Sequence, residues 1–363
     1  MDLVKNASSY STAVKEITGQ ISAPDCMLSI IIKALNEQDK IEAAIVSALA
    51  SIQNMDAEII LADSLSTDKT VEIAARHAIR IVQLSNPEER SCGIGPQLGF
   101  QYSRGKYIYL LDGDMELNPK FLTQAIAYLD DQPDIAGVGG LLEEKNVTNL
   151  VFELRERINR TESHLQPGEV DRLTGGGLYR RKAIEDVGYF SNRNLHSFEE
   201  LELALRLRAK GWRLMRLPIA AIKHYGHTSP LLTLLKSRFR SKYVQGPGEF
   251  LRAALGQAYF LHVIKEFRVF LGVIVGWLLL MFAAFIIPYS WIPFVIIACI
   301  FIIGAVAMIV RKKSIPLGLF AIIDWNLFAV GTIRGAMHKQ IRPNEHIESR
   351  ILQETKFSQT GIR

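Results

Sequence analysis

The chain has few cysteines and lacks several short motifs that define common protein classes. Its 363 residues include three scattered cysteines, Cys26, Cys92 and Cys299, so neither a disulfide framework nor a zinc site is expected. The first apolar strand is not followed by G-x-G-x-x-G, which disfavours a Rossmann dinucleotide fold; the missing G-x-x-x-x-G-K-[ST] disfavours a P-loop kinase or ATPase. Residues 1–26 lack the basic start and apolar core of a signal peptide, and we expect a peripheral segment there.

Charged residues are absent from residues 269–310. Because roughly 20 apolar residues cross a bilayer as a helix, this stretch predicts two transmembrane helices. The prolines at Pro288 and Pro293 would break it into a hairpin, with Tyr289 and Trp291 at interface depth. A buried soluble hairpin is the alternative, which the length of the apolar stretch disfavours.

Basic residues flank this hairpin on both sides, and positive loops mark the cytoplasmic side of a membrane. They are Lys236, Arg238, Arg240, Lys242, Arg252, Lys265 and Arg268 before it, and Arg311, Lys312 and Lys313 after it. Both ends of the hairpin are therefore expected in the cytoplasm. The net charge of +5 fits this cluster meeting anionic lipid better than it fits a nucleic-acid partner.

Residues 311–363 contain a third apolar stretch, residues 315–333, which includes Asp324 and precedes a basic tail. If this stretch crossed the membrane, the tail would lie outside, against the charge rule. We therefore expect a re-entrant or interfacial segment here.

Residues 27–228 alternate apolar runs with helical patterns, which predicts an α/β domain with a mixed, mainly parallel sheet flanked by helices. Strands are expected at residues 28–32, 58–61, 79–84 and 107–111. Helices are expected at residues 39–51 and 95–104, and another helix is expected to follow the second strand and to end at about residue 77. In the first helix Ile41, Ile45, Val46 and Leu49 are expected to face the core. Ser66 or Thr67 is expected to cap the second helix.

Asp112 and Asp114 directly follow the fourth of these strands. Ligands of open α/β sheets bind at the carboxyl ends of the strands. Two carboxylates there suit Mg²⁺ or Mn²⁺ carrying a diphosphate. An isolated D-x-D also occurs in surface turns, so the surrounding pattern has to decide.

Several further segments, read in order, resemble family 2 glycosyltransferases with the GT-A nucleotide-sugar-binding fold. Residues 30–37 resemble the opening strand that ends in Asn-Glu, and residues 59–68 the second strand with its D-x-G-S-T-D turn, with Leu65 in place of the glycine. Next, Gln97-Leu98-Gly99 lies where the family often has Asn-x-Gly, and residues 104–107 lead into D-x-D as in the family. Gly175 to Arg181 resemble the acceptor-side loop, and residues 199–212 the helix that bears the catalytic acid. The resemblance covers residues 27–228.

The resemblance implies a set of donor-binding residues at the strand ends. Nucleotide contacts would come from Leu35, Asn36, Glu37, Asp63 and Asp112, and the divalent cation would be held by Asp112, Asp114 and His224. Asp63 could instead form a local Asx-turn, which is the role we expect for Asp68. His224 could instead be a solvent-facing loop residue, as could His227.

The resemblance also implies that Glu200, assisted by Glu199, is the base that removes the proton of an acceptor hydroxyl. The family usually has Glu-Asp at these two positions, so the side chain of Glu200 is one methylene longer than that of the usual aspartate. Acidic decoration of a helix N-terminus is the alternative role. The sugars would be contacted by Gly175, Gly176, Gly177 and Trp212, although the glycines could also be an ordinary turn. In-line displacement would invert the anomeric centre.

Residues 229–268 mix apolar and basic side chains, as amphipathic interfacial helices do. Arg238, Arg240 and Lys242 could bind the donor diphosphate or a lipid phosphate, or simply add charge at the membrane surface. The Q-x-x-R-W sequence of processive synthases is absent, which favours addition of a single sugar.

Together these features predict a metal-dependent, inverting glycosyltransferase anchored in the inner membrane by several passes, with its catalytic domain facing the cytoplasm. It would move one sugar from a UDP- or GDP-sugar to a lipid-linked saccharide or glycolipid. Alternatives are a polyprenyl-phosphate glycosyltransferase, whose acceptor needs no base, and a non-catalytic nucleotide-binding membrane scaffold. A nucleotidyltransferase is disfavoured because residues 33–37 do not form a glycine-rich basic loop.

Overall fold

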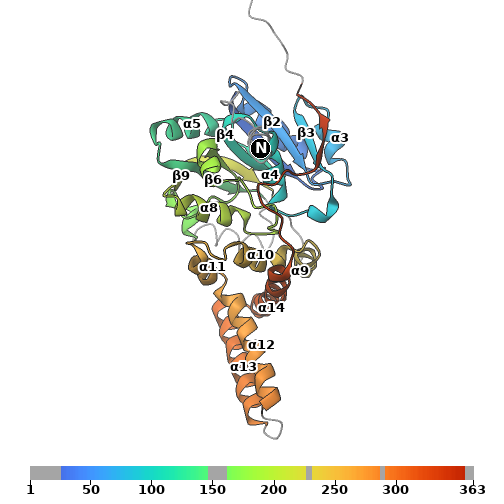
Figure 1. Cartoon of the computed structure of the whole chain (residues 1–363), viewed down its shortest axis with the longest axis vertical. Helices are drawn as coiled ribbons and strands as arrows, with labels where there is room; N and C mark the ends of the chain where they lie inside the picture. Colours follow the sequence, from blue (N-terminus) through green and yellow to red (C-terminus); the bar gives the residue numbers. More distant parts are fainter. Residues whose placement is uncertain (1–25, 146–161, 226–230, 287–290, 356–363) are drawn as a thin grey trace, which may run out of the picture.

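The computed structural model describes residues 26–145, 162–225, 231–286 and 291–355. An α/β domain forms one end of an elongated molecule, and a layer of short helices separates it from a long helical hairpin (Figure 1). The predicted fold class, an α/β sheet flanked by helices and followed by apolar helices, is thus confirmed.

One sheet organises the α/β domain, in the order β10-β3-β2-β1-β4-β8-β6-β9-β5, with β7 paired to β9. The strands are β1 (Cys26–Ala34), β2 (Ala57–Asp63), β3 (Arg80–Leu84), β4 (Gly105–Asp112), β5 (Met115–Leu117), β6 (Ile135–Glu144), β7 (Gly168–Val170), β8 (Gly177–Arg180), β9 (Arg213–His224) and β10 (Ser349–Gln353). The sheet is mixed, as predicted, but it contains more antiparallel strand pairs than the predicted, mainly parallel sheet. Parallel pairing joins β3, β2, β1 and β4 and also β6 with β9, whereas the other pairs are antiparallel.

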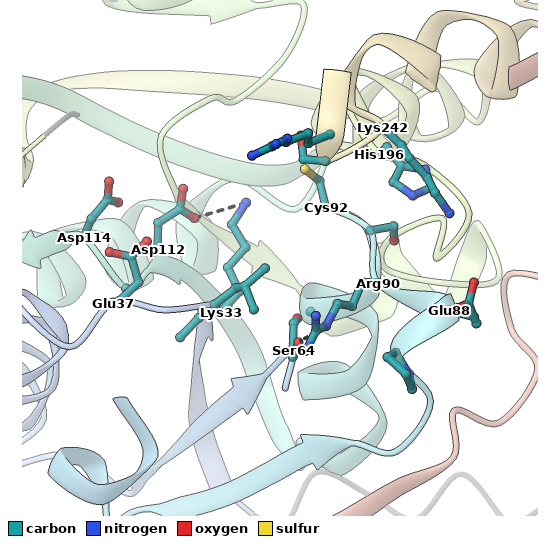
Figure 2. A pocket seen from close by; sticks show the side chains of 18 residues that line it. Lys33, Glu37, Ser64, Glu88, Arg90, Cys92, Asp112, Asp114, His196 and Lys242 are labelled. Atoms are coloured by element: carbon teal, nitrogen blue, oxygen red, sulfur yellow. Dashed lines mark hydrogen bonds and ion pairs between the residues drawn. The ribbon is translucent and has the colours of Figure 1, made fainter. Parts of the chain in front are cut away.

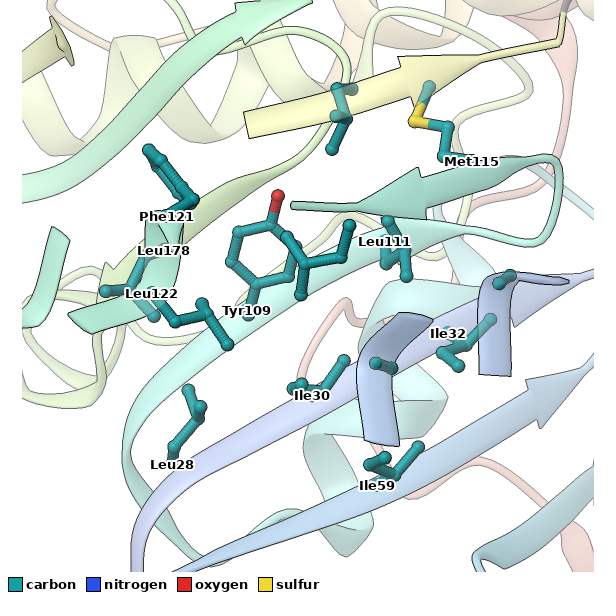
Figure 3. Packing of buried hydrophobic residues seen from close by; sticks show 14 of the residues in the cluster. Leu28, Ile30, Ile32, Ile59, Tyr109, Leu111, Met115, Phe121, Leu122 and Leu178 are labelled. Atoms are coloured by element: carbon teal, nitrogen blue, oxygen red, sulfur yellow. The ribbon is translucent and has the colours of Figure 1, made fainter. Parts of the chain in front are cut away.

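Both faces of the parallel part are buried, which explains why its strands read as unbroken apolar runs. Leu28, Ile30 and Ile32 of β1 belong to one core cluster, shown in Figure 3, whereas Ile31 belongs to the cluster on the opposite face. The domain's helices are α2 (Ile41–Ser51), α3 (Thr70–Ala74), α4 (Ile94–Tyr102), α5 (Phe121–Asp131), α7 (Arg181–Asp186) and α8 (Glu199–Ala209).

Two details of the predicted helices were wrong. Val46 is 50% exposed rather than buried, because Ala44, Ala48 and Ile45 take the core-facing positions of α2. The helix α3 begins only at Thr70, and neither Ser66 nor Thr67 caps it. Asp68 accepts the backbone N–H of Thr70 instead, at 2.9 Å, which is the local turn role expected for it.

The C-terminal part is helical: α9 (Leu231–Arg240), the short η3 (Tyr243–Gln245), α10 (Gly246–Ala253), α11 (Phe260–Glu266), α12 (Arg268–Ile286), α13 (Ile292–Lys312) and α14 (Ile315–Met337). Among the described residues, two segments are long and apolar enough to cross a membrane, Phe294–Lys312 and Ile315–Met337. The helix α12 meets that criterion only jointly with α11, from which it bends by 74°. The expected hairpin thus corresponds to α12 and α13, and the third apolar stretch is one continuous helix.

After α14 the chain returns to the α/β domain (Figure 1). Its strand β10 pairs antiparallel with β3 at the edge of the sheet. On the way, the segment 338–348 contacts the loop before α8, where Arg193 donates to the carbonyl oxygens of Glu345 and His346. The helix α14 is therefore tied to the α/β domain at its C-terminal end.

Candidate functional site

A cavity of about 630 Å³ lies where the carboxyl ends of β1 and β4 meet the helical layer (Figure 2). Its walls come from three parts of the chain. The strand ends contribute Lys33, Leu35, Glu37, Asp112 and Asp114; the loop leading into α4 contributes Glu88, Arg90, Ser91 and Cys92; and the turn between α9 and η3 contributes Arg240, Ser241 and Lys242. His196, just before α8, completes the lining.

The D-x-D aspartates lie at this cavity, as predicted. Asp112 ends β4 in register with Lys33 of β1, and the Lys33 Nζ lies 3.2 Å from the Asp112 carboxylate. The same Nζ lies 3.3 Å from a carboxylate oxygen of Glu199. Burial lowers the pKa of Lys33, but the neighbouring carboxylates outweigh it and raise the pKa well above its ordinary value. Lys33 therefore links the D-x-D strand to the helix that begins at Glu199.

Asp114 directly precedes β5, in which Met115 pairs with His224 of β9. The Nε2 of His224 lies 3.4 Å from an Asp114 oxygen, and its Nδ1 lies 2.7 Å from Glu144. Burial lowers the pKa of His224, but hydrogen bonds to Asp114 and Glu144 outweigh it and raise the pKa to about 9. The carboxylate of Glu144 binds Nδ1 and so fixes the ring with Nε2 directed at Asp114. Carboxylates orient metal-binding histidines in the same way, by binding the ring nitrogen that does not contact the metal. His227 lies outside the described residues.

Glu199 and Glu200 open α8, after Phe198 in a left-handed conformation with φ of 66°. Burial and the adjacent Glu199 raise the pKa of Glu200, and Lys33 counteracts them. The backbone N–H of Gly175 also lowers the pKa of Glu200, so the residue predicted as the base lies near the glycine turn.

The glycine turn adopts backbone angles that other residues rarely reach. Gly175 and Gly176 have φ values of +73° and +87°, and Gly177 begins β8 opposite Leu110 of β4. A Cβ on Gly176 would lie 2.9 Å from the Leu110 carbonyl oxygen. Glycine is therefore required for the turn to pack beside the end of the D-x-D strand.

The predicted nucleotide-binding residues separate into two groups. Leu35 and Glu37 line the cavity, and burial followed by the charge of Asp114 raises the pKa of Glu37 to about 7. Asn36 does not line it, because its side-chain oxygen accepts the backbone N–H of Thr67, at 2.8 Å. Asp63 is fully buried. One of its oxygens accepts hydrogen bonds from Ser66 and Gln83, whereas Oδ1 has no partner in the part of the chain that the structure describes.

The turn that follows Asp63 contains the departure at Leu65. Leu65 has a φ of 64°, in the region where glycine is favoured and where the resembled motif has glycine. The guanidinium of Arg90 donates to the carbonyl oxygens of Ser64 and Leu65, at 2.9 and 2.5 Å, and holds the strained turn.

The three basic residues of the interfacial segment do not act together. Arg238 pairs with Asp324 of α14 at 2.9 Å and is drawn away from the cavity. Arg240 and Lys242 line the cavity. The charge pattern of the sequence could not separate them, because the difference depends on the packing of α9 against α14.

Trp212, which was predicted to contact a sugar, does not line the cavity. Trp212 follows the C-terminal end of α8, whose 11 residues extend about 16 Å from Glu199. Its indole N–H donates to Asp186, at 2.9 Å, and its ring packs on a core cluster.

The sequence patterns did not single out Lys33 or His196. A lysine one position before the end of an apolar strand is a usable signal for Lys33, since a lone charge in a buried strand needs a partner. Nothing in the local sequence distinguishes His196, whose partner Glu249 lies in α10.

Within the described residues, no group of three or more His, Cys, Asp or Glu side chains lies close enough to hold a metal ion by itself. The donor chemistry of Asp112, Asp114 and His224 still fits a hard cation, because Mg²⁺ is commonly held by one or two carboxylates with substrate phosphates supplying further oxygens.

Residues 29–188 match the family model described as glycosyl transferase family 2. The match includes the D-x-D and the glycine turn and ends before α8. An uncharacterized glycosyltransferase of Mycobacterium tuberculosis (strain ATCC 25618 / H37Rv) is 24% identical over 202 residues, which are 53% of this chain and 84% of that protein. An uncharacterized protein of the same strain is 32% identical over 112 residues, which are 30% of this chain and only 32% of that relative's length.

Among solved structures, S. aureus TarS 1–349 aligns with a TM-score of 0.46 and 17% identity, over 64% of this chain and 73% of that one. Its complex with UDP-GlcNAc aligns with a TM-score of 0.47 and 16% identity, over 64% and 74%. The family match and the named relative agree: residues 29–188 of this chain are similar to glycosyl transferase family 2.

Proposed function

We propose that this protein is an inverting glycosyltransferase that moves one sugar from a nucleotide-sugar to a membrane-associated acceptor, a lipid-linked saccharide or glycolipid. One observation carries the proposal: a single cavity is lined both by the sheet-end aspartates and by Arg240 and Lys242 of the helical layer beside the apolar hairpin. A donor at the sheet and an acceptor from the membrane surface could meet there.

The nucleoside would lie over the ends of β1 and β2, against Leu35 and Glu37. The unpartnered Oδ1 of Asp63 supports this location, because a buried carboxylate oxygen without a donor is costly and a base N–H would satisfy it. Uracil and guanine both offer such a donor, so the proposal includes UDP- and GDP-sugars.

Asp112 and Asp114, with His224, would hold Mg²⁺ or Mn²⁺ together with the donor diphosphate. When bound, such a cation stabilises the negative charge that develops on the leaving nucleoside diphosphate. The protein's own charges support the same end, since Lys33 and Lys40 lie 3.2 Å and 3.9 Å from the two aspartates. They limit the repulsion between the aspartates and the diphosphate.

Glu200 would accept the proton of the acceptor hydroxyl as its oxygen attacks the anomeric carbon and the bond to the diphosphate breaks. Attack from the face opposite the leaving group inverts the anomeric centre, so an α-linked donor gives a β-linked product. Glu199 and Lys33 would position this base. Burial and the neighbouring carboxylate suit the role, because a raised pKa makes a carboxylate a stronger base.

The acceptor would approach from an inner membrane, with α12 and α13 as the anchor and the α/β domain on the cytoplasmic side. The basic flanks of the hairpin support this orientation. A polyprenyl-phosphate glycosyltransferase remains the second candidate, favoured by Arg240 and Lys242 in the cavity. Its acceptor is already deprotonated and would not need Glu200. A non-catalytic nucleotide-binding scaffold is a third possibility, to which Leu65 and Glu200 point as departures from the family pattern.

The test is nucleotide release by the full-length protein from a panel of UDP- and GDP-sugars, with membrane extract as the acceptor source. Mg²⁺ or Mn²⁺ should support release from one donor, and a chelator should abolish it. Asp114→Asn should lower release at least 100-fold, since electrostatic groups of this kind contribute about that much. Asp131→Asn, on the exposed end of α5, is the matched control and should leave release unchanged.

The variant Glu200→Gln distinguishes a hydroxyl acceptor from a phosphate acceptor. If it stops release along with Asp114→Asn, the acceptor is a hydroxyl; if release continues, a phosphate acceptor is favoured. Metal-dependent nucleotide binding without release from any donor would favour the scaffold, and no nucleotide binding at all would sink the proposal.

A further inference from the structure

The loop before α8 contains a buried histidine paired with a buried glutamate. The His196 Nδ1 lies 2.7 Å from one carboxylate oxygen of Glu249, and the His196 backbone N–H donates to the other, at 2.9 Å. Glu249 is 0% exposed and lies in the first turn of α10. Both oxygens of the glutamate thus bind His196, one at its ring and one at its backbone N–H.

The other ring nitrogen, Nε2, has no hydrogen-bond partner among the described residues. His196 is 5% exposed, its Nε2 is buried without a hydrogen bond, and the residue lines the cavity. A buried polar atom without a partner is unfavourable, and a bound ligand that reached Nε2 would remove this cost. The carboxylate that fixes Nδ1 holds the ring in one orientation and leaves Nε2 as its remaining hydrogen-bonding atom.

The surroundings of this nitrogen favour an anion. Arg240 and Lys242 line the same cavity, and Figure 2 shows Lys242 and His196 at the end away from Asp112 and Asp114. Arg90 also lines it, although its guanidinium is used by the Ser64 turn. Two acidic residues lie at this end: Glu88, which lines the cavity and is exposed, and Glu249, whose two oxygens are both used by His196.

This end of the cavity joins the catalytic domain to the helical layer. Ser197 Oγ donates to the carbonyl oxygen of Tyr243 in η3, at 2.8 Å. Gly246 packs so closely on Ser197 that an added Cβ would lie 1.9 Å from its Oγ. A ligand at His196 would therefore touch groups from both layers, one of which adjoins the apolar helices.

We infer that His196, held by Glu249, forms with Arg240 and Lys242 a second anion subsite, which binds a phosphate group of the membrane acceptor. The inference rests on the proposed function and deepens it, because it makes the acceptor a phosphate-bearing lipid. The imidazolium form of His196 donates to a phosphate oxygen through Nε2, and the neutral form accepts from a protonated one. The donor diphosphate, at the opposite end with Asp112 and Asp114, does not need this subsite.

The experiment measures binding to the full-length protein in phosphatidylcholine nanodiscs. Three probes are used: a long-chain polyprenyl phosphate, the uncharged polyprenol of the same length, and UDP or GDP with Mg²⁺. The variants are His196→Gln and Lys242→Gln. Their matched controls are His262→Gln and Lys236→Gln, which change exposed residues of α11 and α9.

Each variant should weaken polyprenyl phosphate binding about tenfold, the loss expected for one charge-assisted hydrogen bond. Polyprenol and nucleotide binding, and both controls, should match the wild type. Equal affinity of the wild type for polyprenyl phosphate and polyprenol, or wild-type phosphate affinity in both variants, overturns the inference. So does weaker nucleotide binding with unchanged lipid binding, which would assign the subsite to the donor.

The two proposals can fail separately. If the wild type binds no nucleotide, the proposed function fails, while the lipid comparison still judges the subsite. If His196→Gln does not fold, Lys242→Gln decides, because Lys242 is only partly buried and does not contribute to the His196–Glu249 pair.

Discussion

Lys33 is the residue on which the charge balance of the site depends. Its ammonium lies within 3.3 Å of both Asp112 and Glu199, which belong to a strand and a helix far apart in sequence. Partly buried carboxylates repel one another unless a cation lies between them. Lys33 therefore sets both the geometry and the proton affinity of the groups around it.

The first prediction concerns the pH dependence of transfer. Burial and Glu199 raise the pKa of Glu200 to about 8, and below that pH the carboxyl is protonated and cannot accept a proton. The single-turnover rate should therefore rise with pH through about 8. In Lys33→Met the rising limb should move to higher pH, because the lysine's charge lowers that pKa. Lys69→Met, exposed beside α3, is the control, and an unmoved limb in Lys33→Met would contradict this role.

A second residue-scale prediction concerns Asn36, which the sequence suggested as a nucleotide contact. Its φ of 59° suits asparagine or glycine, and its side chain holds Thr67. Asn36→Ala should lower the free energy of unfolding by about 1–2 kcal/mol, from lost hydrogen bonding and left-handed strain.

Urea denaturation of Asn36→Ala and Asn36→Gly checks this. Glycine should recover the backbone part of the loss, since it adopts positive φ freely. If both variants unfolded like the wild type while nucleotide affinity fell, Asn36 would be a ligand contact after all.

At the scale of elements, α8 shows how one helix can combine a reactive end with a rigid body. Glu199 and Glu200 begin it, whereas Glu202, one turn on, is 1% exposed and pairs with Arg206 through two hydrogen bonds of 2.9 Å. Tyr189 donates a third, at 2.6 Å. A run of glutamates in the sequence therefore contains both candidate catalytic and structural members.

We expect Glu202→Gln to lower the free energy of unfolding by about 3 kcal/mol, because it leaves the buried Arg206 without its counter-charge. Glu42→Gln, exposed on α2, should change it by less than about 0.5 kcal/mol. Thermal unfolding followed by circular dichroism measures both. A small loss in Glu202→Gln would mean that Arg206 finds another acceptor.

The helix pattern of the sequence located α2 and α4 within a few residues, whereas the position of α8 came from the family resemblance. The pattern misplaced Val46 and the start of α3. Both errors concern positions that amphipathic periodicity does not decide. Small residues such as Ala44 and Ala48 pack closest to the sheet, and the Asp68 turn replaces the first turn of the expected helix.

For the whole molecule, the return of the chain after α14 constrains its membrane topology. Because β10 pairs with β3, the residues after α14 lie on the same side as the α/β domain. An odd number of membrane crossings between Phe267 and His338 would place the α/β domain and the residues after α14 on opposite sides of the membrane. If α12 and α13 cross, α14 does not, although it packs on both of them as well as on α10 and η3.

Cysteine labelling with a membrane-impermeant maleimide tests this topology, in a background without native cysteines. Lys120→Cys in the α/β domain and Arg350→Cys in β10, both exposed, should react from the same side. Trp291→Cys at the start of α13, 72% exposed, should react from the other. Labelling of Arg350→Cys from the side opposite to Lys120→Cys would show that α14 crosses.

The sequence by itself determined the α/β domain, the D-x-D edge, the glycine turn and the apolar hairpin, because each depends on local patterns: apolar runs, strand ends, backbone freedom and length. Only the tertiary structure decided which charges meet. Lys33 joins Asp112 and Glu199, Arg238 turns away to Asp324, and His196 faces the cavity because Glu249 holds it. These contacts join residues distant in sequence, and burial rather than spacing makes them strong.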